Sequence, residues 1–269
     1  MKRRRMWACV GGTAAIVIYL LLAFLYNALP QDTFYQLTEC PIPGDGQRML
    51  VFSPHPDDEA IAIGGYLFSS REAGANVQVI LATDGNRRGL REQRYQEFKE
   101  ATEQLQILPA ELRFWGYPDG RLADHFDGLE AQVEKEIALF QPEYVIYPHP
   151  EDRHPDHAAL GRAVEGALAN RVTAGQNIKA YAYLVHYKYY PEPQILTRGH
   201  HLLPPQAVFK HNEIWNKITL TAEAQTAKEE AIHQYRTQMR NPFLRPLITG
   251  LMRNNELLVS RDIQPIQQL

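Results

Sequence analysis

Short apolar runs recur along most of the chain, and polar or helix-like stretches separate them. Four of these runs end in a polar turn, as a buried strand does where it meets a loop; they lie at 49–52, 77–82, 112–115 and 144–147. Stretches with helical composition or spacing follow them, at 58–75, 91–108, 129–140 and 156–170. Strands that alternate with helices predict a mostly parallel sheet with helices on its faces, which is a Rossmann-like three-layer α/β sandwich.

The pattern is less regular after residue 170. Residues 181–187 and 218–220 are apolar enough to add strands, and residues 222–239 predict a helix. Several apolar side chains recur near the C-terminus: Phe243, Leu247, Ile248, Leu251 and Met252. These side chains could cover the domain or contact a membrane surface, and the pattern does not separate the two alternatives.

The N-terminal segment has a different character. Residues 7–29 carry no formal charge and are mostly aliphatic or aromatic, and about 20 such residues cross a hydrocarbon layer as one helix. A cleaved signal peptide is the alternative, with residues 2–5 as its basic region, but no small-residue cleavage site follows the apolar run. We therefore expect an uncleaved, single-pass membrane anchor.

The basic residues 2–5 favour a cytoplasmic N-terminus, because positive charge flanks the cytoplasmic ends of membrane spans. The catalytic part then lies on the extracytoplasmic side. Residues 1–29 are thus predicted to form a basic tip and a transmembrane helix. Residues 30–46, rich in proline, glycine and polar side chains, are predicted to be a linker, and residues 47–269 one domain.

Composition narrows the class of function. The chain has 269 residues and is 45% hydrophobic, which is enough for one α/β domain with a real core. Its net charge is −3, and the part beyond residues 2–5 is more acidic still, so we expect no nucleic-acid partner. Of the two cysteines, Cys9 lies in the apolar segment, which leaves Cys40 alone in the body. Neither an internal disulfide nor a cysteine metal site is expected there.

The first chemically distinctive cluster is PHPDDE, at residues 54–59, directly after the first strand-like run. His55 and Asp58 lie three positions apart at the start of a helix, so their side chains can converge on one ion. Asp57 points elsewhere and is free for another task. The alternative is plain helix capping, in which one of these carboxylates caps the helix and its dipole favours Glu59. Capping accounts for one carboxylate but not for three beside a histidine.

The second cluster is HPEDRHPDH, at residues 149–157, and it follows the fourth strand-like run. A solvated charged loop is the alternative for such a composition, and Asp156 could simply cap the next helix. However, ligands of parallel α/β folds bind at the carboxyl ends of strands, where both clusters lie. Together the clusters supply histidine, aspartate and histidine for a zinc site with one open position.

The strings PHPDDE and HPDH resemble the signatures of the LmbE-like/PIG-L family of zinc-dependent N-acetylglucosaminyl deacetylases. The resemblance runs from about residue 47 to near residue 260. Smaller similarities support it: TDG at 83–85, Arg94 with Glu97, GYPDG at 116–120, and a stretch from Lys228 to Gln238 that contains Tyr235. The paired strings are specific to the family, whereas each smaller similarity is only moderately so.

The resemblance implies roles for particular residues. His55, Asp58 and His157 would hold the metal, which is Zn²⁺ by analogy, although two histidines and one carboxylate also suit Fe²⁺. Asp57 would be the general base, and a protonated His154 would stabilise the oxyanion, with Asp156 orienting it and favouring its charge. The positions that contact sugar in relatives are Arg94 and Asp119. Asn86 stands where many relatives carry an acidic residue, so the resemblance does not predict how this loop would contact a sugar.

The expected function is removal of the acetyl group from an N-acetylglucosamine unit in a lipid-linked or polymeric glycan. The predicted anchor motivates that choice, since a tethered enzyme meets membrane-bound substrates. Alternatives are hydrolysis of another amide on a small conjugate, a non-catalytic sugar-binding protein of the same fold, and a zinc-storage protein. His186 lies in an apolar run, where a histidine is more often packed in the core than functional.

Overall fold

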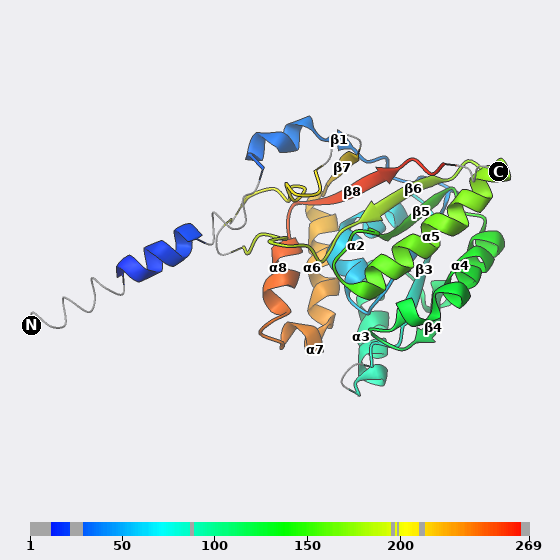
Figure 1. Ribbon diagram of the computed structural model, residues 1–269, viewed down its shortest axis with the longest axis horizontal. Coiled ribbons are helices and arrows are strands. Elements are labelled where there is room, and N and C mark those ends of the chain that lie inside the picture. Colours follow the sequence, from blue (N-terminus) through cyan, green and yellow to red (C-terminus); the bar gives the residue numbers. More distant parts are fainter. Residues whose placement is uncertain are drawn as a thin grey trace, which may run out of the picture.

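The computed structural model describes residues 12–21, 29–86, 89–194, 197, 199–209 and 213–264. Its centre is an eight-stranded sheet with the order β1-β7-β8-β6-β5-β2-β3-β4 (Figure 1). The strands are β1 (Thr38–Glu39), β2 (Arg48–Ser53), β3 (Asn76–Thr83), β4 (Leu112–Tyr117), β5 (Tyr144–Pro148), β6 (Lys179–Tyr183), β7 (Ile214–Thr219) and β8 (Asn255–Arg261). Within the described residues only β8 runs antiparallel to its neighbours, so the predicted mostly parallel sheet is confirmed.

Seven helices surround this sheet in the described part of residues 29–264. They are α2 (Asp58–Glu72), α3 (Arg91–Gln104), α4 (Phe126–Phe140), α5 (Pro155–Thr173), α6 (Ala222–Gln234), α7 (Arg236–Met239) and α8 (Arg245–Leu251). Short 3₁₀ segments are η1 (Gln31–Gln36), η2 (Pro109–Glu111) and η3 (Leu122–His125). Helices α2, α3 and α6 pack together, and α4 packs on α5 (Figure 1).

The direction of the chain across the sheet reverses beside β2. The chain passes from β2 to β3 and β4, then returns to β5 on the other side of β2 and continues to β6. Because parallel crossovers are right-handed, α2 and α3 lie on one face of the sheet and α4 and α5 on the other. β2 and β5 pair in parallel, with Met49 opposite Tyr144. Their carboxyl ends therefore meet at a switch point, where such folds bind ligands.

The central strands are buried on both faces. Leu50, Val51 and Phe52 of β2 are fully buried, as are most residues of β3 and β5. This arrangement explains why the strands read as continuous apolar runs rather than as alternating patterns. The four predicted strands are all present.

Helix α2 departs from helical geometry at Ile63, where φ is −139° and ψ is 20°. The backbone N–H groups of Gly65 and Tyr66 donate to the carboxylate of Glu256 on β8, each over 2.8 Å. That carboxylate also accepts from Lys228 Nζ at 2.8 Å, and both side chains are buried. A buried, hydrogen-bonded ion pair thus joins α6 and β8 to the helix that begins with Asp58.

Several element boundaries differ from the prediction. The expected helix at 222–239 is interrupted at Tyr235, where ψ is 62°, and so forms α6 and α7. The expected strand at 181–187 ends at Tyr183. The segment predicted as a linker contains η1 and β1, and β1 pairs with β7, so this part of the chain packs against the domain.

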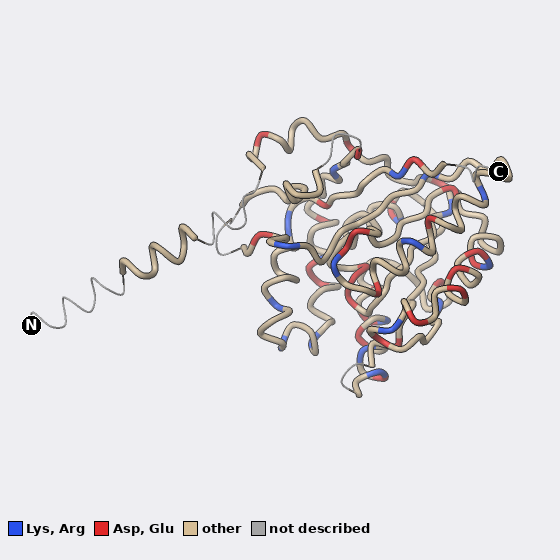
Figure 2. Tube along the Cα trace, viewed as in Figure 1, with Lys and Arg blue, Asp and Glu red and all other residues tan. Residues whose placement is uncertain are grey.

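Most of the predicted membrane anchor lies outside the described residues, which omit 1–11 and 22–28. Residues 12–21 are helical and exposed. Within the portion of the chain that the structure covers, we find no helix whose length and apolar character would let it cross a membrane. Figure 2 shows acidic and basic residues interspersed over the described domain in that view.

Candidate active site

The loop after β2 brings the first cluster to the switch point. The carbonyl of Pro54 accepts hydrogen bonds from the backbone N–H and the hydroxyl of Thr83, which join the loop to β3. Asp57 directly precedes α2 and has a φ of 136°, a region that non-glycine residues rarely adopt. Its side chain makes no capping hydrogen bond. Asp57 is therefore buried and has a strained backbone, but its side chain does not cap the helix. This observation argues against the capping alternative for this residue.

The loop after β5 brings the second cluster beside the first. His154 is the N-cap of α5, and its Nδ1 accepts from the backbone N–H of Asp156 at 3.3 Å. Gly161, two turns from the start of α5, faces the Pro148 carbonyl so closely that a Cβ atom would lie 2.4 Å from that oxygen. Glycine at this position lets the start of α5 approach β5, which places His157 against the first cluster.

The structure brings together the three predicted metal ligands. Nδ1 of His55 lies 3.1 Å from Oδ2 of Asp58, and Nε2 of His157 lies 3.0 Å from the same oxygen. The two imidazole rings are 5.3 Å apart between centroids. All three side chains are buried. Three donor atoms from two distant parts of the sequence thus converge on one point.

The surroundings of His157 fit a metal ion. The ring is completely buried, yet neither of its nitrogens makes a hydrogen bond of acceptable geometry. An unsatisfied buried nitrogen is costly, and a metal on Nε2 would remove that cost. Tetrahedral zinc with bonds of about 2.0–2.1 Å holds its ligand atoms roughly 3.3 Å apart, close to the separations seen here. Three other groups of side chains in the described residues could also hold a metal, and each shares His55 or His157 with this set, so they belong to the same site: His55 with His154 and His157, Asp152 with His157 and His186, and His55 with Asp119 and Asp156.

Asp57 lies beside the three ligands but is paired differently. Its Oδ2 is 3.5 Å from Nη2 of Arg94. Burial raises the pKa of Asp57 to about 7, a rise that Asp58 reinforces and Arg94 opposes. A carboxyl group with this pKa can accept and return a proton near neutrality, as a general base must.

Arg94 and Asp119, the predicted sugar contacts, both line the same cavity. Arg94 donates to the carbonyl of Pro56 at 2.8 Å and lies 3.4 Å from Asp119. With its amide oxygen turned toward Arg94, Gln238 accepts from Nε of Arg94 at 2.6 Å. In this structure Arg94 therefore fixes the wall around Asp57, while its contact with a sugar stays a prediction.

The carboxylate of Asp156 has a different partner from the one expected. It lies 2.9 Å from Nε2 of His55 and accepts from the backbone N–H groups of Gly120 and Leu122, at 2.6 and 3.0 Å. The Asp156 side chain therefore orients His55, and only its backbone N–H contacts the ring of His154. The reason is the turn of helix at the start of α5, where the backbone of Asp156 faces His154 and its side chain points toward η3.

The expected charge of His154 also differs. Burial, together with the neighbouring imidazoles of His55, His157 and His186, lowers the pKa of His154 to about 3. This shift favours the neutral ring near pH 7, where a protonated ring was expected. Because Nδ1 accepts the Asp156 N–H, the neutral ring carries its proton on Nε2. His154 can donate from Nε2 without being a cation.

Asp152 is a site residue that the sequence did not single out. Its Oδ2 is 3.3 Å from Nδ1 of His157 and accepts from the backbone of Val185 and His186, at 3.0 and 2.9 Å. Its Oδ1 accepts from the backbone of His154 at 2.8 Å. A carboxylate behind a histidine ligand fixes the orientation of the ring and its tautomer. The one available signal was a third carboxylate within the charged cluster.

Glu59 and His186 also belong to the site. Glu59 is buried and bonded to the hydroxyls of Tyr235 and Ser53, and burial raises its pKa to about 8. His186 lies 4.7 Å from His157 between ring centroids and lines the cavity, with 27% of its side chain exposed. The core-packing interpretation of His186 is therefore incomplete, since its ring faces the histidine cluster.

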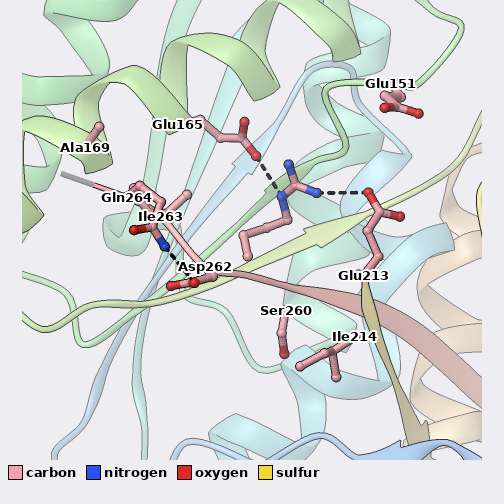
Figure 3. Close-up of a pocket in the computed structure, with 10 residues that line it drawn as sticks. Glu151, Glu165, Ala169, Glu213, Ile214, Ser260, Asp262, Ile263 and Gln264 are labelled. Atoms are coloured by element: carbon pink, nitrogen blue, oxygen red, sulfur yellow. Dashed lines mark hydrogen bonds and ion pairs between the residues drawn. The ribbon is translucent and has the colours of Figure 1, made fainter. Parts of the chain in front are cut away.

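The described cavities differ in their chemistry. The one above the histidines has a volume of about 470 Å³, and an adjoining one of about 540 Å³ shares His154 and His186 with it. A larger cavity of about 740 Å³ lies against α5, the start of β7 and the end of β8 (Figure 3). There Arg261 bridges Glu165 and Glu213, at 2.8 and 3.1 Å, and none of the clustered histidines contributes. We therefore assign the chemistry to the cavity above the histidines, which contains Asp57 and Asp58.

Both clusters lie within the part of the chain that matches a known family model. Residues 50–168 match the family model described as PIG-L, GlcNAc-PI de-N-acetylase. A probable N-acetyl-alpha-D-glucosaminyl L-malate deacetylase 2 from Bacillus cereus is 34% identical in an alignment 137 residues long, which covers 46% of this chain and 61% of that protein. A 1D-myo-inositol 2-acetamido-2-deoxy-alpha-D-glucopyranoside deacetylase from Corynebacterium urealyticum is 28% identical in an alignment 167 residues long, which covers 48% of this chain and 50% of that protein. The chain thus spans about three fifths or less of the length of these relatives.

Solved structures share the fold. The A40926 pseudoaglycone deacetylase Dbv21 superposes with a TM-score of 0.62 at 20% identity, covering 83% of this chain and all of that chain (100%). N,N'-diacetylchitobiose deacetylase from Pyrococcus horikoshii gives a TM-score of 0.57 at 19% identity, covering 94% and 96%. At these identities the likeness establishes the fold alone.

Proposed function

We propose that this protein is a metal-dependent hydrolase of the PIG-L/LmbE-like deacetylase family that removes the acetyl group from an N-acetylglucosamine-containing conjugate. The match of residues 50–168 to the PIG-L family model and the similarity to two deacetylases support this proposal. The observation that carries the proposal is the convergence of His55, Asp58 and His157, with Asp57 adjacent and paired to none of them. Storage or structural binding of a metal does not need a second, strained carboxylate beside the ligands.

His55, Asp58 and His157 would hold Zn²⁺, for which two imidazoles, one carboxylate and an open position are suited. The bound ion supplies Lewis-acid activation of water and of the acetyl carbonyl near neutral pH. Fe²⁺ suits the same donors, so metal analysis of the purified protein decides between the two.

The residues of the chain perform the proton transfers. Asp57 takes a proton from the attacking water and returns it to the departing amine, and Arg94 holds the Asp57 loop in place. His154 donates from Nε2 to the carbonyl oxygen as that oxygen becomes negative. Loss of one such donor typically costs about 2.7–4 kcal/mol of transition-state stabilisation. A hydrogen bond from neutral His154 therefore replaces the cationic one expected from the sequence.

The names of the relatives guide the choice of substrate. They act on N-acetylglucosamine bonded to malate or on an acetamido-glucopyranoside of inositol, and the family model is named for an inositol phospholipid. The common unit is a 2-acetamido sugar with a substituent on its neighbouring carbon. We take this unit as the substrate class, with a lipid-linked sugar as the favoured member.

Membrane anchoring is a separate part of the proposal. Residues 7–29 would form a single-pass anchor, with the N-terminus cytoplasmic and the domain extracytoplasmic. The support is the uncharged length of this segment and the basic residues before it. Protease treatment of intact spheroplasts tests the orientation: the domain should be digested from outside, whereas protection would contradict it.

The deciding experiment measures metal content and acetate release in one preparation of the full-length protein. Wild type should bind about one equivalent of metal and release acetate from an N-acetylglucosaminide. His157→Ala should lose the metal and the activity together. A protein that binds metal tightly but releases no acetate from any 2-acetamido sugar or other amide would be a storage or binding protein, and the proposal would be wrong.

A further inference from the structure

The catalytic cavity changes character from its floor to its mouth. On the floor, His55 is 7% exposed, Asp57 9% and Asp58 1%. Toward the mouth the lining includes Leu90, half-buried, together with Leu244 and Phe243, which are 36% and 87% exposed. A sugar whose amide reaches the polar floor must extend past these apolar side chains.

The segment that carries Phe243 and Leu244 is firmly attached at its beginning. The hydroxyl of Thr237 donates to Glu97 on α3 at 2.6 Å, and the Thr237 N–H donates to the same carboxylate at 3.0 Å. Next along the chain, Asn241 Oδ1 accepts from the Phe243 N–H at 3.0 Å, which closes a tight turn. The apolar tip is therefore presented by a fixed turn, although its side chains are exposed.

The rest of the apolar C-terminal stretch is packed inside. Ile248 and Leu251 are buried, while Phe243 stays almost fully exposed. Packing against the body, one of the two alternatives for this stretch, thus accounts for α8 but leaves Phe243 and Leu244 unexplained. These two residues lie outside the range 50–168 that the family model matches.

The mouth of this cavity and its charged lining suit different chemical groups. Among the described residues that line this cavity, Arg94 is the single arginine or lysine, and it already contacts Asp57, Asp119 and the Pro56 carbonyl. Arg153 lines an adjoining cavity that shares Asp119 with this one. At the apolar mouth, an alkyl or acyl substituent would meet leucine and phenylalanine, whereas a carboxylate there would lose solvation without a polar partner from these side chains.

We propose that Leu90, Phe243 and Leu244 form a subsite for an apolar group attached to the carbon next to the acetamido carbon of the sugar. The inference rests on the proposed function, because the cavity floor must hold the acetamido group. The acetamido group is at C2 and the substituent at the adjacent C1, so the substituent leaves the floor along the cavity wall. The subsite thus selects sugars with lipid-like or alkyl substituents over those with acidic ones.

The test compares soluble glycosides, with full-length protein in lipid nanodiscs. The probes are the methyl and butyl glycosides of N-acetylglucosamine and N-acetylglucosaminyl malate, and acetate release gives kcat/KM for each. Three partly buried methylenes should make the butyl glycoside roughly tenfold better than the methyl glycoside for wild type, and the malate conjugate poorer than either. In the double variant Phe243→Ser with Leu244→Ser, the butyl-to-methyl ratio should fall to about twofold or less.

A matched control is Leu139→Ser on α4, which changes a side chain that is 70% exposed and lies outside this cavity. Its butyl-to-methyl ratio should equal that of wild type. An unchanged ratio in the double variant, or a wild-type preference for the malate conjugate, would overturn the subsite.

Two other outcomes separate the possible errors. If the double variant keeps the wild-type ratio on soluble glycosides but loses activity toward the same sugar on a lipid in vesicles, the tip contacts the membrane and the subsite is wrong. If the metal-loaded wild type releases no acetate from any of the glycosides, the proposed function itself fails, and the subsite with it.

Discussion

The loops after β2 and β5 have similar compositions, yet they build the site in different ways. The first loop separates two adjacent carboxylates by an unusual backbone conformation, so that Asp58 faces the histidines and Asp57 faces Arg94. The second uses regular helix geometry, and two of its carboxylates support histidines rather than the reaction: Asp152 lies behind His157, and Asp156 lies behind His55. The support crosses between the loops, so neither loop forms a complete site alone.

The largest difference between the loops should appear at Asp57. Asp57→Asn removes the base but keeps the shape of the side chain, so turnover should fall by about 10²–10⁴. Metal content should stay near the wild-type value, because Asp57 is not among the ligands. Acetate release and elemental analysis on the same sample check both points. Loss of metal together with activity would mean that Asp57 is a ligand, and the two adjacent carboxylates would then not have different roles.

Asp152 tests the second loop. Asp152→Asn leaves the three ligands unchanged but weakens the contact with Nδ1 of His157. Metal affinity should fall by about 10–100-fold, measured by competition with a chromogenic chelator. Glu151→Gln, an exposed neighbouring carboxylate on the same loop, serves as the control and should keep wild-type affinity. Equal affinities for all three proteins would mean that His157 needs no support.

Asp156 distinguishes the observed contact from the one expected from the sequence. Because its carboxylate contacts His55, Asp156→Asn should lower metal affinity by about tenfold or somewhat more. If Asp156 acted through His154 instead, kcat would fall while metal affinity stayed constant. Measuring kcat at saturating metal alongside the chelator competition separates these two effects.

The smallest effect is expected at Tyr235, which lies after α6 and contacts Glu59 next to the first loop. Tyr235→Phe deletes the hydroxyl that donates to the buried Glu59. Leaving that buried carboxyl group with one hydrogen-bond partner fewer should lower the free energy of unfolding by about 1–3 kcal/mol. Thermal denaturation should show a midpoint several degrees lower, with metal affinity close to wild type. An unchanged midpoint would mean that Glu59 finds another partner.

Local patterns predicted the two clusters that converge because each has a short spacing at a strand end, and the family resemblance singled out His157 within the second. His55 and Asp58 lie three apart at the start of α2, and His157 lies in the first turn of α5. The partners of Asp152 and Asp156 depend instead on how two loops distant in sequence fit together. Spacing along one loop could not reveal that Asp156 crosses to His55.

The difference between local patterns and distant contacts also explains which strands were predicted correctly and which were missed. The central strands are apolar along their length, so composition identified them. β8 was not predicted, because it begins with Asn255 and Glu256, which are polar but fully buried. Glu256 is there because it receives the N–H groups that α2 frees at its irregular turn, and Lys228 balances its charge. A buried polar residue whose partners are distant in the sequence does not produce a hydrophobic pattern that predicts its strand.

The positive φ of Asp57 implies a conflict between folding and chemistry at a single position. Glycine accepts this conformation without the roughly 1–3 kcal/mol that other residues incur, and it would also take a carboxylate out of the interior. An Asp57→Gly protein should therefore melt at a higher temperature than its parent while being inert. A screen for thermal stability alone would therefore select inactive variants at residue 57. Only selection for catalytic activity would retain the aspartate.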